Sequence, residues 1–245
     1  MKIVLLGYGR MGQDIEKVAV ERGHAIAARF TIDDPLPELT KLSPEVKSAD
    51  CAIDFSSPDA TAHHIHTLGP LHVPLVVGTT GWNDQLASHV KFIRECGGTL
   101  LHASNFSVGA YILFHLAAEA SKLVDRFPEY DAAIHETHHR LKKDAPSGTA
   151  LHLAKKVLMA LKRKTEIVTS LNNRAIEPHE LLVSSSRIGS VAGTHTLTFE
   201  SDADAIEITH TAHTRRGFAL GAVAGAEWVR GKTGVFTIED FVLNK

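Results

Sequence analysis

Apolar and polar positions divide the chain into two regions with different periodicities. In the first hundred residues, short apolar runs alternate with longer segments of helical spacing, which is typical of a doubly wound parallel sheet. A strand that is buried on both faces is apolar at consecutive positions, and such runs predict strands at 2–6, 24–30, 51–55, 75–77 and 99–102. Helices are predicted between these strands, one ending at Gly23 and others over 58–68 and about 84–96.

After Ser107 the pattern changes. Further helices are predicted over about 108–123, 148–161 and 215–230, strands over 131–136, 181–189, 193–200 and 205–210, and a closing segment over 235–243. Two of these strands alternate with a period of two, as expected of a sheet with one covered face. We therefore predict an α/β protein with an N-terminal doubly wound domain, 1–106 with 216–245 returning to it, and a C-terminal α+β domain with a mixed sheet, 107–215.

A glycine motif follows the first predicted strand. Residues Gly7–Gly12 read G-x-G-x-x-G between a strand and a helix, which is the context of a dinucleotide-binding Rossmann domain. Gly7 permits the tight turn, Gly9 lets the backbone approach a pyrophosphate, and Gly12 allows the helix to pack closely on the strand. The motif predicts that NADH or NADPH is bound by Gly7, Tyr8, Gly9, Arg10, Met11 and Gly12.

The residues that bind the adenosine ribose are less well defined. An acid is expected about 20 residues beyond the glycines, and Asp33 and Asp34 are the nearest, although Thr31 also falls close to this position. We assign Asp33, and we expect NADH to serve at least as well as NADPH. Arg29 is the base that argues against this preference, because it is near enough to meet a 2′-phosphate.

Two small polar loops follow later strands of the first domain. Ligands of doubly wound sheets bind outside the carboxyl ends of the strands. We therefore expect the cofactor to contact Gly78, Thr79, Thr80, Ala103, Ser104, Asn105 and Phe106. The alternative is that these are ordinary loops without a ligand.

The segment 136–150 contains the main candidate binding and catalytic residues of the second domain. Pro146 and Ser147 predict a helix start, whose unpaired amide groups and dipole favour an anion. Lys142 and His139 add positive charge, so the segment predicts a site for a carboxylate or phosphate. His138 is a candidate proton donor, because imidazole titrates near neutral pH. In a continuous strand His138 and His139 would face opposite sides, so both serve one site only if the strand ends there.

Composition narrows the class of protein. The formal net charge of −2 offers no electrostatic case for nucleic acid or an anionic membrane. No apolar run approaches the length of a membrane span, and the N-terminus lacks the features of a signal peptide, so we expect a cytoplasmic enzyme. Cys51 and Cys96 suggest reduced residues and no zinc site. His63, His64 and His66 are interpreted as a surface cluster, and no metal site is expected.

Together these motifs resemble those of the 4-hydroxy-tetrahydrodipicolinate reductase (dihydrodipicolinate reductase) family of lysine and diaminopimelate biosynthesis. The resemblance covers nearly the whole chain. It is carried by Gly7–Gly12, Val77–Gly81, Asn105–Gly109, Glu136–His139, Phe218–Ala219 and, most specifically, Lys142–Ala150.

The resemblance implies an oxidoreductase that reduces a cyclic imine dicarboxylate with NADH or NADPH. It implies that His138 donates or accepts a proton, that Lys142 donates one, and that His139, Gly148 and Thr149 bind the substrate. It also implies a C-terminal domain for substrate binding and tetramer formation. We therefore expect a homotetramer that joins through the hydroxyl-rich strands between 181 and 210, where Thr194, Thr196, Thr198 and Phe199 lie close together.

The chain departs from the family pattern in two places. The loop at 33–37 is shorter than in long members, so the cofactor preference is not carried over, and residues 103–106 read Ala-Ser-Asn-Phe instead of Ala-Ala-Asn-Phe. Two alternatives remain: another Rossmann amino-acid dehydrogenase of the aspartate pathway, and a dinucleotide-binding module without catalysis. The first leaves the motif 142–150 unexplained, and the second leaves His138 and Lys142 without a role.

Overall fold

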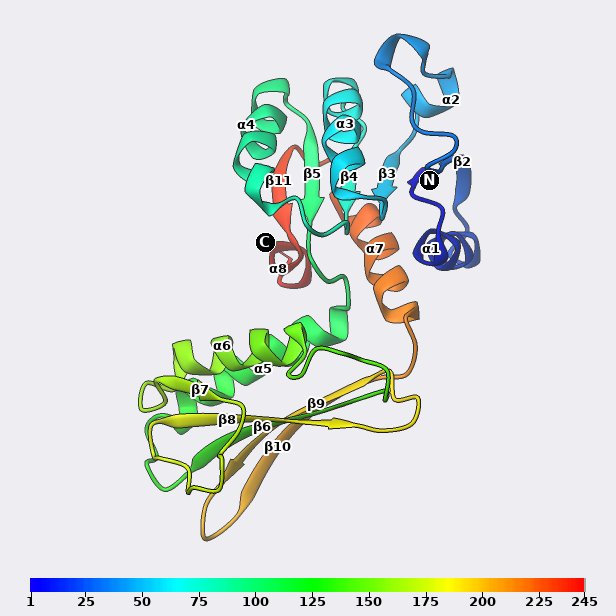
Figure 1. Ribbon diagram of the computed structural model, residues 1–245. Coiled ribbons are helices and arrows are strands. Elements are labelled where there is room, and N and C mark those ends of the chain that lie inside the picture. The colour runs from blue at the N-terminus through cyan, green and yellow to red at the C-terminus, as the bar shows by residue number, and fades with distance from the viewer. Residues whose placement is uncertain (245) are drawn as a thin grey trace. The chain divides into compact units, whose positions relative to one another are not determined.

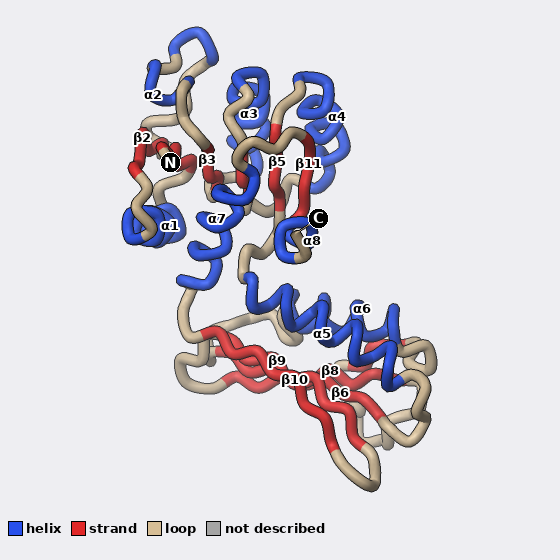
Figure 2. Tube along the Cα trace, turned by 180° about the vertical axis from the view of Figure 1, so that it is seen from behind, coloured by secondary structure: helices blue, strands red, loops and turns tan. Residues whose placement is uncertain are grey.

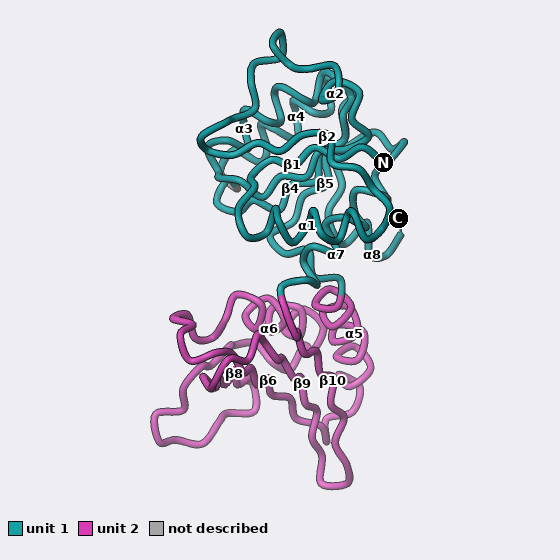
Figure 3. Tube along the Cα trace, turned by 90° about the vertical axis from the view of Figure 1, so that its right-hand side faces the viewer, with its two compact units in different colours: residues 1–108, 215–245 teal, residues 109–214 magenta. Residues whose placement is uncertain are grey.

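The computed structural model describes residues 1–244 and divides the chain into two compact units (Figure 3). Unit 1 comprises Met1–Val108 and Arg215–Lys245, and unit 2 comprises Gly109–Thr214. Of the described helices, none is long and apolar enough to cross a membrane.

Unit 1 is built on a six-stranded parallel sheet with helices on both faces (Figure 1). The strand order is β11-β5-β4-β3-β1-β2. The strands are β1 (Lys2–Leu6), β2 (Ala25–Phe30), β3 (Cys51–Asp54), β4 (Leu75–Val77), β5 (Thr99–His102) and β11 (Gly234–Thr237). The α-helices are α1 (Arg10–Glu21), α2 (Pro44–Lys47), α3 (Pro58–Leu68), α4 (Leu86–Cys96), α7 (Arg216–Val229) and α8 (Ile238–Val242), and the 3-10 turns are η1 (Leu39–Lys41), η2 (Gly69–Leu71) and η3 (Asn83–Gln85).

The central strands of unit 1 are apolar because both of their faces are covered. Residues 3–6, 51–53, 75–77 and 100–101 are at most 1% exposed. All the pairings in this sheet are parallel, so the loops after β1, β3, β4 and β5 leave the sheet at one edge. The six-stranded sheet and its covering helices are the doubly wound fold that the apolar runs predict.

Unit 2 is a five-stranded mixed sheet with α5 (Val108–Val124) and α6 (Gly148–Ala160) packed on one face (Figure 2). The strand order is β10-β9-β6-β8-β7, with β6 parallel to β8 and antiparallel to β9. The strands are β6 (Asp131–His138), β7 (Glu166–Val168), β8 (Glu180–Arg187), β9 (Gly193–Glu200) and β10 (Ala205–Ala212). Alternating residues such as Ile134, Val183 and Leu197 pack beneath the helices.

Hydroxyl and imidazole groups line the opposite face of this sheet. Thr194 pairs with Thr211 through a hydrogen bond of 3.2 Å, and Thr196 pairs with Thr209 at 3.0 Å. Phe199, which we expected beside these threonines, is fully buried on the helix-covered face, because it is an odd number of residues from them along β9.

Candidate active site

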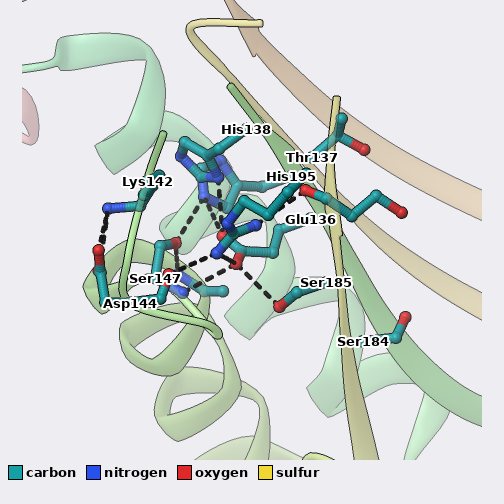
Figure 4. A network of polar contacts seen from close by, with 12 residues as sticks. Glu136, Thr137, His138, Lys142, Asp144, Ser147, Ser184, Ser185 and His195 are labelled. Carbon is teal, nitrogen blue, oxygen red and sulfur yellow. Dashed lines mark hydrogen bonds and ion pairs between the residues drawn. The ribbon is translucent and has the colours of Figure 1, made fainter. Parts of the chain in front are cut away.

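A buried carboxylate, Glu136 on β6, is the centre of the polar cluster in unit 2 (Figure 4). Its Oε1 accepts hydrogen bonds from the Ser147 amide at 2.9 Å, the Ser185 hydroxyl at 2.9 Å and the Arg187 guanidinium at 2.8 Å. The carboxylate therefore ties the start of α6 to the neighbouring strand β8.

Two buried histidines lie against the other carboxylate oxygen. Oε2 of Glu136 is 3.0 Å from Nδ1 of His138 and 3.6 Å from Nε2 of His195. His195 also lies 3.2 Å from the Ser147 hydroxyl, and the two imidazole centroids are 5.1 Å apart. Each histidine therefore shares Glu136 with the helix start.

The environment separates the protonation states of these groups. Burial opposes the charge of Glu136, but hydrogen bonds from Ser147, Arg187 and Ser185 lower its pKa to about 2. Burial lowers the pKa of His195 to about 4, and the positive form of His138 beside it adds to this shift. Burial also lowers the pKa of His138, although the charge of Glu136 acts in the opposite direction. At neutral pH the cluster thus holds one negative carboxylate and two neutral imidazoles.

Beside the cluster, the helix α6 begins with free amide groups. Ser147 caps the helix, since its hydroxyl accepts from the Ala150 amide at 3.2 Å. Within residues 1–244 no partner is found for the amides of Gly148 and Thr149, which are the next two in the helix. A Cβ built on Gly148 would meet nothing within 4 Å, so the backbone there is open to a ligand.

Lys142 and His139 lie on the loop between β6 and α6. Nζ of Lys142 donates to both oxygens of Asp144 at 2.8 and 2.9 Å (Figure 4). His139 is the first residue beyond β6, and its carbonyl accepts from the Lys142 amide at 3.1 Å. The strand therefore ends at His138, which removes the objection that the two adjacent histidines must point to opposite faces.

Sheet register explains why part of this cluster escapes sequence analysis. Glu136 pairs with His195 across β6 and β9, and His138 pairs with Arg187 across β6 and β8. The partners are about fifty residues or more apart in the chain, and nothing local marks them. The contact between Glu136 and His138 could have been predicted from the sequence, because residues two apart in a strand share one face.

The same atoms resemble a set of metal ligands. Glu136, His138 and His195 each offer a buried ligand atom, and these atoms lie within 4.8 Å of one another. The Arg187 guanidinium is bound to the same carboxylate, and its positive charge opposes a second cation there. The cluster therefore fits proton transfer better than it fits metal binding.

In unit 1 the glycine motif forms one wall of a cavity of about 590 Å³. Backbone crowding explains two of its glycines, since a Cβ on Gly7 would lie 2.4 Å from the Phe55 carbonyl and one on Gly12 would lie 2.3 Å from the Gly7 carbonyl. A Cβ on Gly9 would meet nothing within 4 Å. The cavity is lined by Gly7, Tyr8, Gly9, Phe30, Thr31, Ile32, Asp33, Pro35, Phe55, Ser56, Ser57, Ala60 and His64.

This cavity fits the adenosine and pyrophosphate part of a dinucleotide. Gly9 caps α1 without any side-chain hydrogen bond, and the first turn of α1 contains no acid, so the helix start favours an anion. Asp33, the predicted ribose ligand, lines the same cavity. Arg10 and Met11 follow Gly9 in the first turn of α1 but do not line the cavity.

The other two predicted cofactor loops do not line this cavity, although they leave the same edge of the sheet after β4 and β5. Thr79 uses its hydroxyl and its carbonyl in hydrogen bonds within the protein. The hydroxyl donates to Asp54 at 2.9 Å, and the carbonyl accepts from Trp82 at 2.7 Å. Asn105 uses its side chain to accept from the Ser107 amide, and the Phe106 side chain is buried. Gly78, Thr80, Ala103 and Ser104 are half-buried or exposed.

The structure corrects our interpretation of the histidines on α3. We expected a surface cluster, and this is wrong for His64, which is buried and lies 2.8 Å from Oδ2 of the fully buried Asp54. His63 bonds to the Leu36 carbonyl at 2.9 Å, and His66 packs against Phe92. The acid is on β3, about ten residues earlier in the chain, so helical spacing alone does not reveal it.

The fold and the two sets of groups define a class, the two-domain reductases that use a nicotinamide dinucleotide. Within that class the chain belongs to the dihydrodipicolinate reductase family. The family's N-terminal sequence pattern matches residues 1–106, and its C-terminal sequence pattern matches residues 109–242.

Individual relatives agree with this assignment. A 4-hydroxy-tetrahydrodipicolinate reductase of Christiangramia forsetii is 41% identical over 98% of this chain and 97% of its own. A 4-hydroxy-tetrahydrodipicolinate reductase of Rickettsia bellii is 37% identical over 96% of this chain and 92% of its own. The fold is shared with the dipicolinate-bound dihydrodipicolinate reductase of Paenisporosarcina sp. TG-14, with a TM-score of 0.76, 21% identity and 97% of each chain covered.

The chain is accordingly an oxidoreductase of lysine and diaminopimelate biosynthesis. It reduces 4-hydroxy-tetrahydrodipicolinate to tetrahydrodipicolinate with NADH or NADPH. The alternatives of another amino-acid dehydrogenase and of a module without catalysis are excluded by this family assignment.

Proposed function

We propose that the polar cluster of unit 2 moves the protons of this reduction and that the start of α6 binds the substrate. The substrate gains a hydride and a proton and loses its hydroxyl as water. When bound, the reduced nicotinamide supplies the hydride. Because the substrate is a dicarboxylate, two anion sites and at least one proton donor are needed.

His138 and Lys142 are the groups that we assign to proton transfer. Lys142 carries a proton as an ammonium, so it acts as the donor. His138 is neutral at pH 7 because burial lowers its pKa, so its imidazole can accept a proton and return it. Glu136 lies 3.0 Å from Nδ1 of His138 and stabilises the imidazolium while it holds a proton.

The carboxylates of the substrate are assigned to the same loop. The free amides of Gly148 and Thr149 donate to one carboxylate, where the helix dipole adds to the attraction. His139 contributes a donor to substrate binding from the end of β6. The observation that carries the proposal is this juxtaposition of an open helix start and a buried acid–histidine cluster joined through Ser147.

In unit 1 we assign cofactor binding to the glycine motif and the neighbouring loops. The amides of Arg10, Met11 and Gly12 donate to the pyrophosphate, since they have no partner in the part of the chain that is described. Asp33 accepts from a ribose hydroxyl. The backbone at Gly78–Thr80 and Ala103–Phe106 contributes from the same edge of the sheet.

Substitution tests the proton-transfer roles. His138→Ala and Lys142→Ala should each lower kcat by about 10²–10⁴-fold, the usual contribution of a general acid or base. The rate is followed as the loss of reduced nicotinamide absorbance with 4-hydroxy-tetrahydrodipicolinate, and NADH affinity should stay unchanged because both residues belong to unit 2. Lys143→Ala is the matched control, since it removes an exposed charge from the same loop. A variant that keeps near-normal kcat contradicts the role of that residue.

For the assembly, we propose a homotetramer that joins through the open face of the sheet in unit 2. The paired threonines of β9 and β10 support this, because they form a row of hydroxyl groups that a copy of the same face can contact, with Glu207 as an exposed charge opposite Thr198. Light scattering at micromolar concentration should give the mass of four 26.6 kDa chains. The double variant Thr196→Lys and Thr198→Lys should reduce this mass, and a wild-type mass of one or two chains contradicts the proposal.

We place the enzyme in the cytoplasm. Cys51 and Cys96 are both free thiols, which suits a reducing compartment. Fractionation of cells that produce the full chain checks this location, and activity recovered outside the cytoplasmic fraction contradicts it.

A further inference from the structure

Beside the glycine motif, Tyr8 contacts two charged side chains, Glu16 and Arg29, to which the proposed function gives no role. Nε of Arg29 on β2 donates to Oε2 of Glu16 on α1 at 2.8 Å, and its terminal nitrogen donates to Oε1 of the same carboxylate. The Tyr8 hydroxyl also donates to Glu16, and the guanidinium lies over the Tyr8 ring, 5.6 Å from its centroid. Hydrogen bonds from Arg29 outweigh desolvation and lower the pKa of Glu16 to about 2, so the pair stays charged.

This group is placed next to the predicted ribose site. Tyr8 stands between Gly7 and Gly9, and it lines the cavity together with Thr31 and Asp33. Arg29 is the penultimate residue of β2, the strand whose end meets the adenosine ribose in dinucleotide-binding domains. The following segment, 31–37, contains no lysine or arginine.

The same bidentate geometry that binds a carboxylate also binds a phosphate, so Glu16 and a 2′-phosphate are competitors for Arg29. Arg29 does not line the cavity while it is bound to Glu16. A 2′-phosphate would have to displace Glu16, whose carboxylate would keep only the hydrogen bond from Tyr8. Since both ion pairs are charge-assisted, the exchange offers little net gain.

We propose that Glu16 determines the cofactor preference by holding Arg29 away from the position of a 2′-phosphate, so that the chain binds NADH more tightly than NADPH. This rests on the use of a nicotinamide dinucleotide by unit 1. The proposal gives Glu16 a role in cofactor specificity, although this residue lies on α1 beyond the glycine motif.

Direct binding of the two nucleotides tests the proposal. Dissociation constants for NADH and NADPH are measured by calorimetry with the full-length protein, without turnover. In Glu16→Gln the guanidinium is released, and NADPH should bind about tenfold more tightly, the usual value of one hydrogen bond to a charged group. NADH affinity should change by less than about twofold. In the double variant Glu16→Gln with Arg29→Gln, the wild-type ratio of the two constants should return.

Glu21→Gln is the matched control. Glu21 is on the same helix and also pairs with an arginine, Arg216, so the variant removes the same charge from α1. Its ratio of dissociation constants should remain that of the wild type.

Three results overturn the proposal: an unchanged NADPH affinity in Glu16→Gln, an equal gain in Glu21→Gln, or a loss of NADPH affinity in Arg29→Gln alone, which would show that Arg29 already binds the phosphate. Because no turnover is measured, failure of the proton-transfer roles leaves these results unaffected. Failure of either nucleotide to bind the wild type instead contradicts the use of a dinucleotide.

Discussion

Each unit has a helix start to which we propose that an anion binds, but the two helix starts are built differently. In unit 1, α1 starts at Gly9 with no side-chain cap and no acid in its first turn. In unit 2, α6 starts at Ser147, whose hydroxyl caps the helix and whose amide is held by the buried Glu136. Gly9 and Gly148 are alike in one respect, since a Cβ on either would meet only open space.

This difference separates binding from chemistry. The helix start in unit 1 has no side-chain cap, so it can bind a phosphate through backbone amides alone. The helix start in unit 2 shares Glu136 with His138 and Arg187, so the proposed substrate site and the protonation of the cluster depend on one carboxylate. Unit 1 is therefore suited to hold a cofactor, and unit 2 is suited to proton transfer.

Blocking each helix start in turn should give the largest effect. Gly9→Val should weaken NADH binding by about 100-fold, because the side chain excludes the phosphate from charge-assisted amide donors. Gly148→Val should weaken dipicolinate binding by a similar factor. Each ligand is titrated by calorimetry against both variants.

The two glycine variants control for each other. Neither added side chain meets a neighbour at Cβ, so the melting temperature should fall only slightly, and each variant should bind the other ligand normally. If one variant weakens both ligands equally, the two helix starts are not independent and the comparison fails.

Removing the charge of Glu136 should have the next largest effect. Glu136→Gln should lower kcat by about 10–100-fold, because His138 loses the negative charge that stabilises and orients its imidazolium. The charge of Glu136 raises the pKa of His138, so in the variant this pKa falls further. The acidic limb of the pH–rate profile that reports this imidazole should therefore move to lower pH.

Since Glu136→Gln also removes the negative charge that pairs with Arg187, stability must be measured beside activity. A lower melting temperature with an unmoved acidic limb would show a structural role alone. NADH affinity, a property of unit 1, should stay the same.

The smallest predicted effect is a pH dependence of stability. In the folded chain burial lowers the pKa of His195 to about 4, whereas in the unfolded chain the pKa stays near the ordinary histidine value of 6.5. Between these values the unfolded state binds more protons, so stability falls as pH falls. From pH 7 to pH 5 this should cost about 2 kcal/mol. His195→Asn should lose that part of the decline in melting temperature, and an undiminished decline would assign it to other groups.

The fold of unit 1 could be predicted from the sequence more completely than that of unit 2. Strands of consecutive apolar residues and glycines in tight turns are local features, so β1, β3, β4 and β5 could be predicted to within one residue. The short β7 and α2 were not predicted, because three or four residues show no clear periodicity. In unit 2 the sequence of 136–150 predicts an anion site and a proton donor. It does not predict that His195 and Arg187 contact Glu136. They join Glu136 only through pairing between strands that are far apart in sequence.

The insertion of unit 2 into unit 1 has a consequence for the order of synthesis. Residues 109–214 form one continuous unit, whereas unit 1 also needs 215–245, which supply the helix α7 and the edge strand β11. As the ribosome proceeds from the N-terminus, unit 2 is complete before α7 and β11 exist, and at the usual rate unit 1 remains unfinished for roughly several seconds longer. During that interval the apolar surface that α7 later covers on β3, β4 and β5 is exposed, so the nascent first unit is the part of this protein most in need of a chaperone.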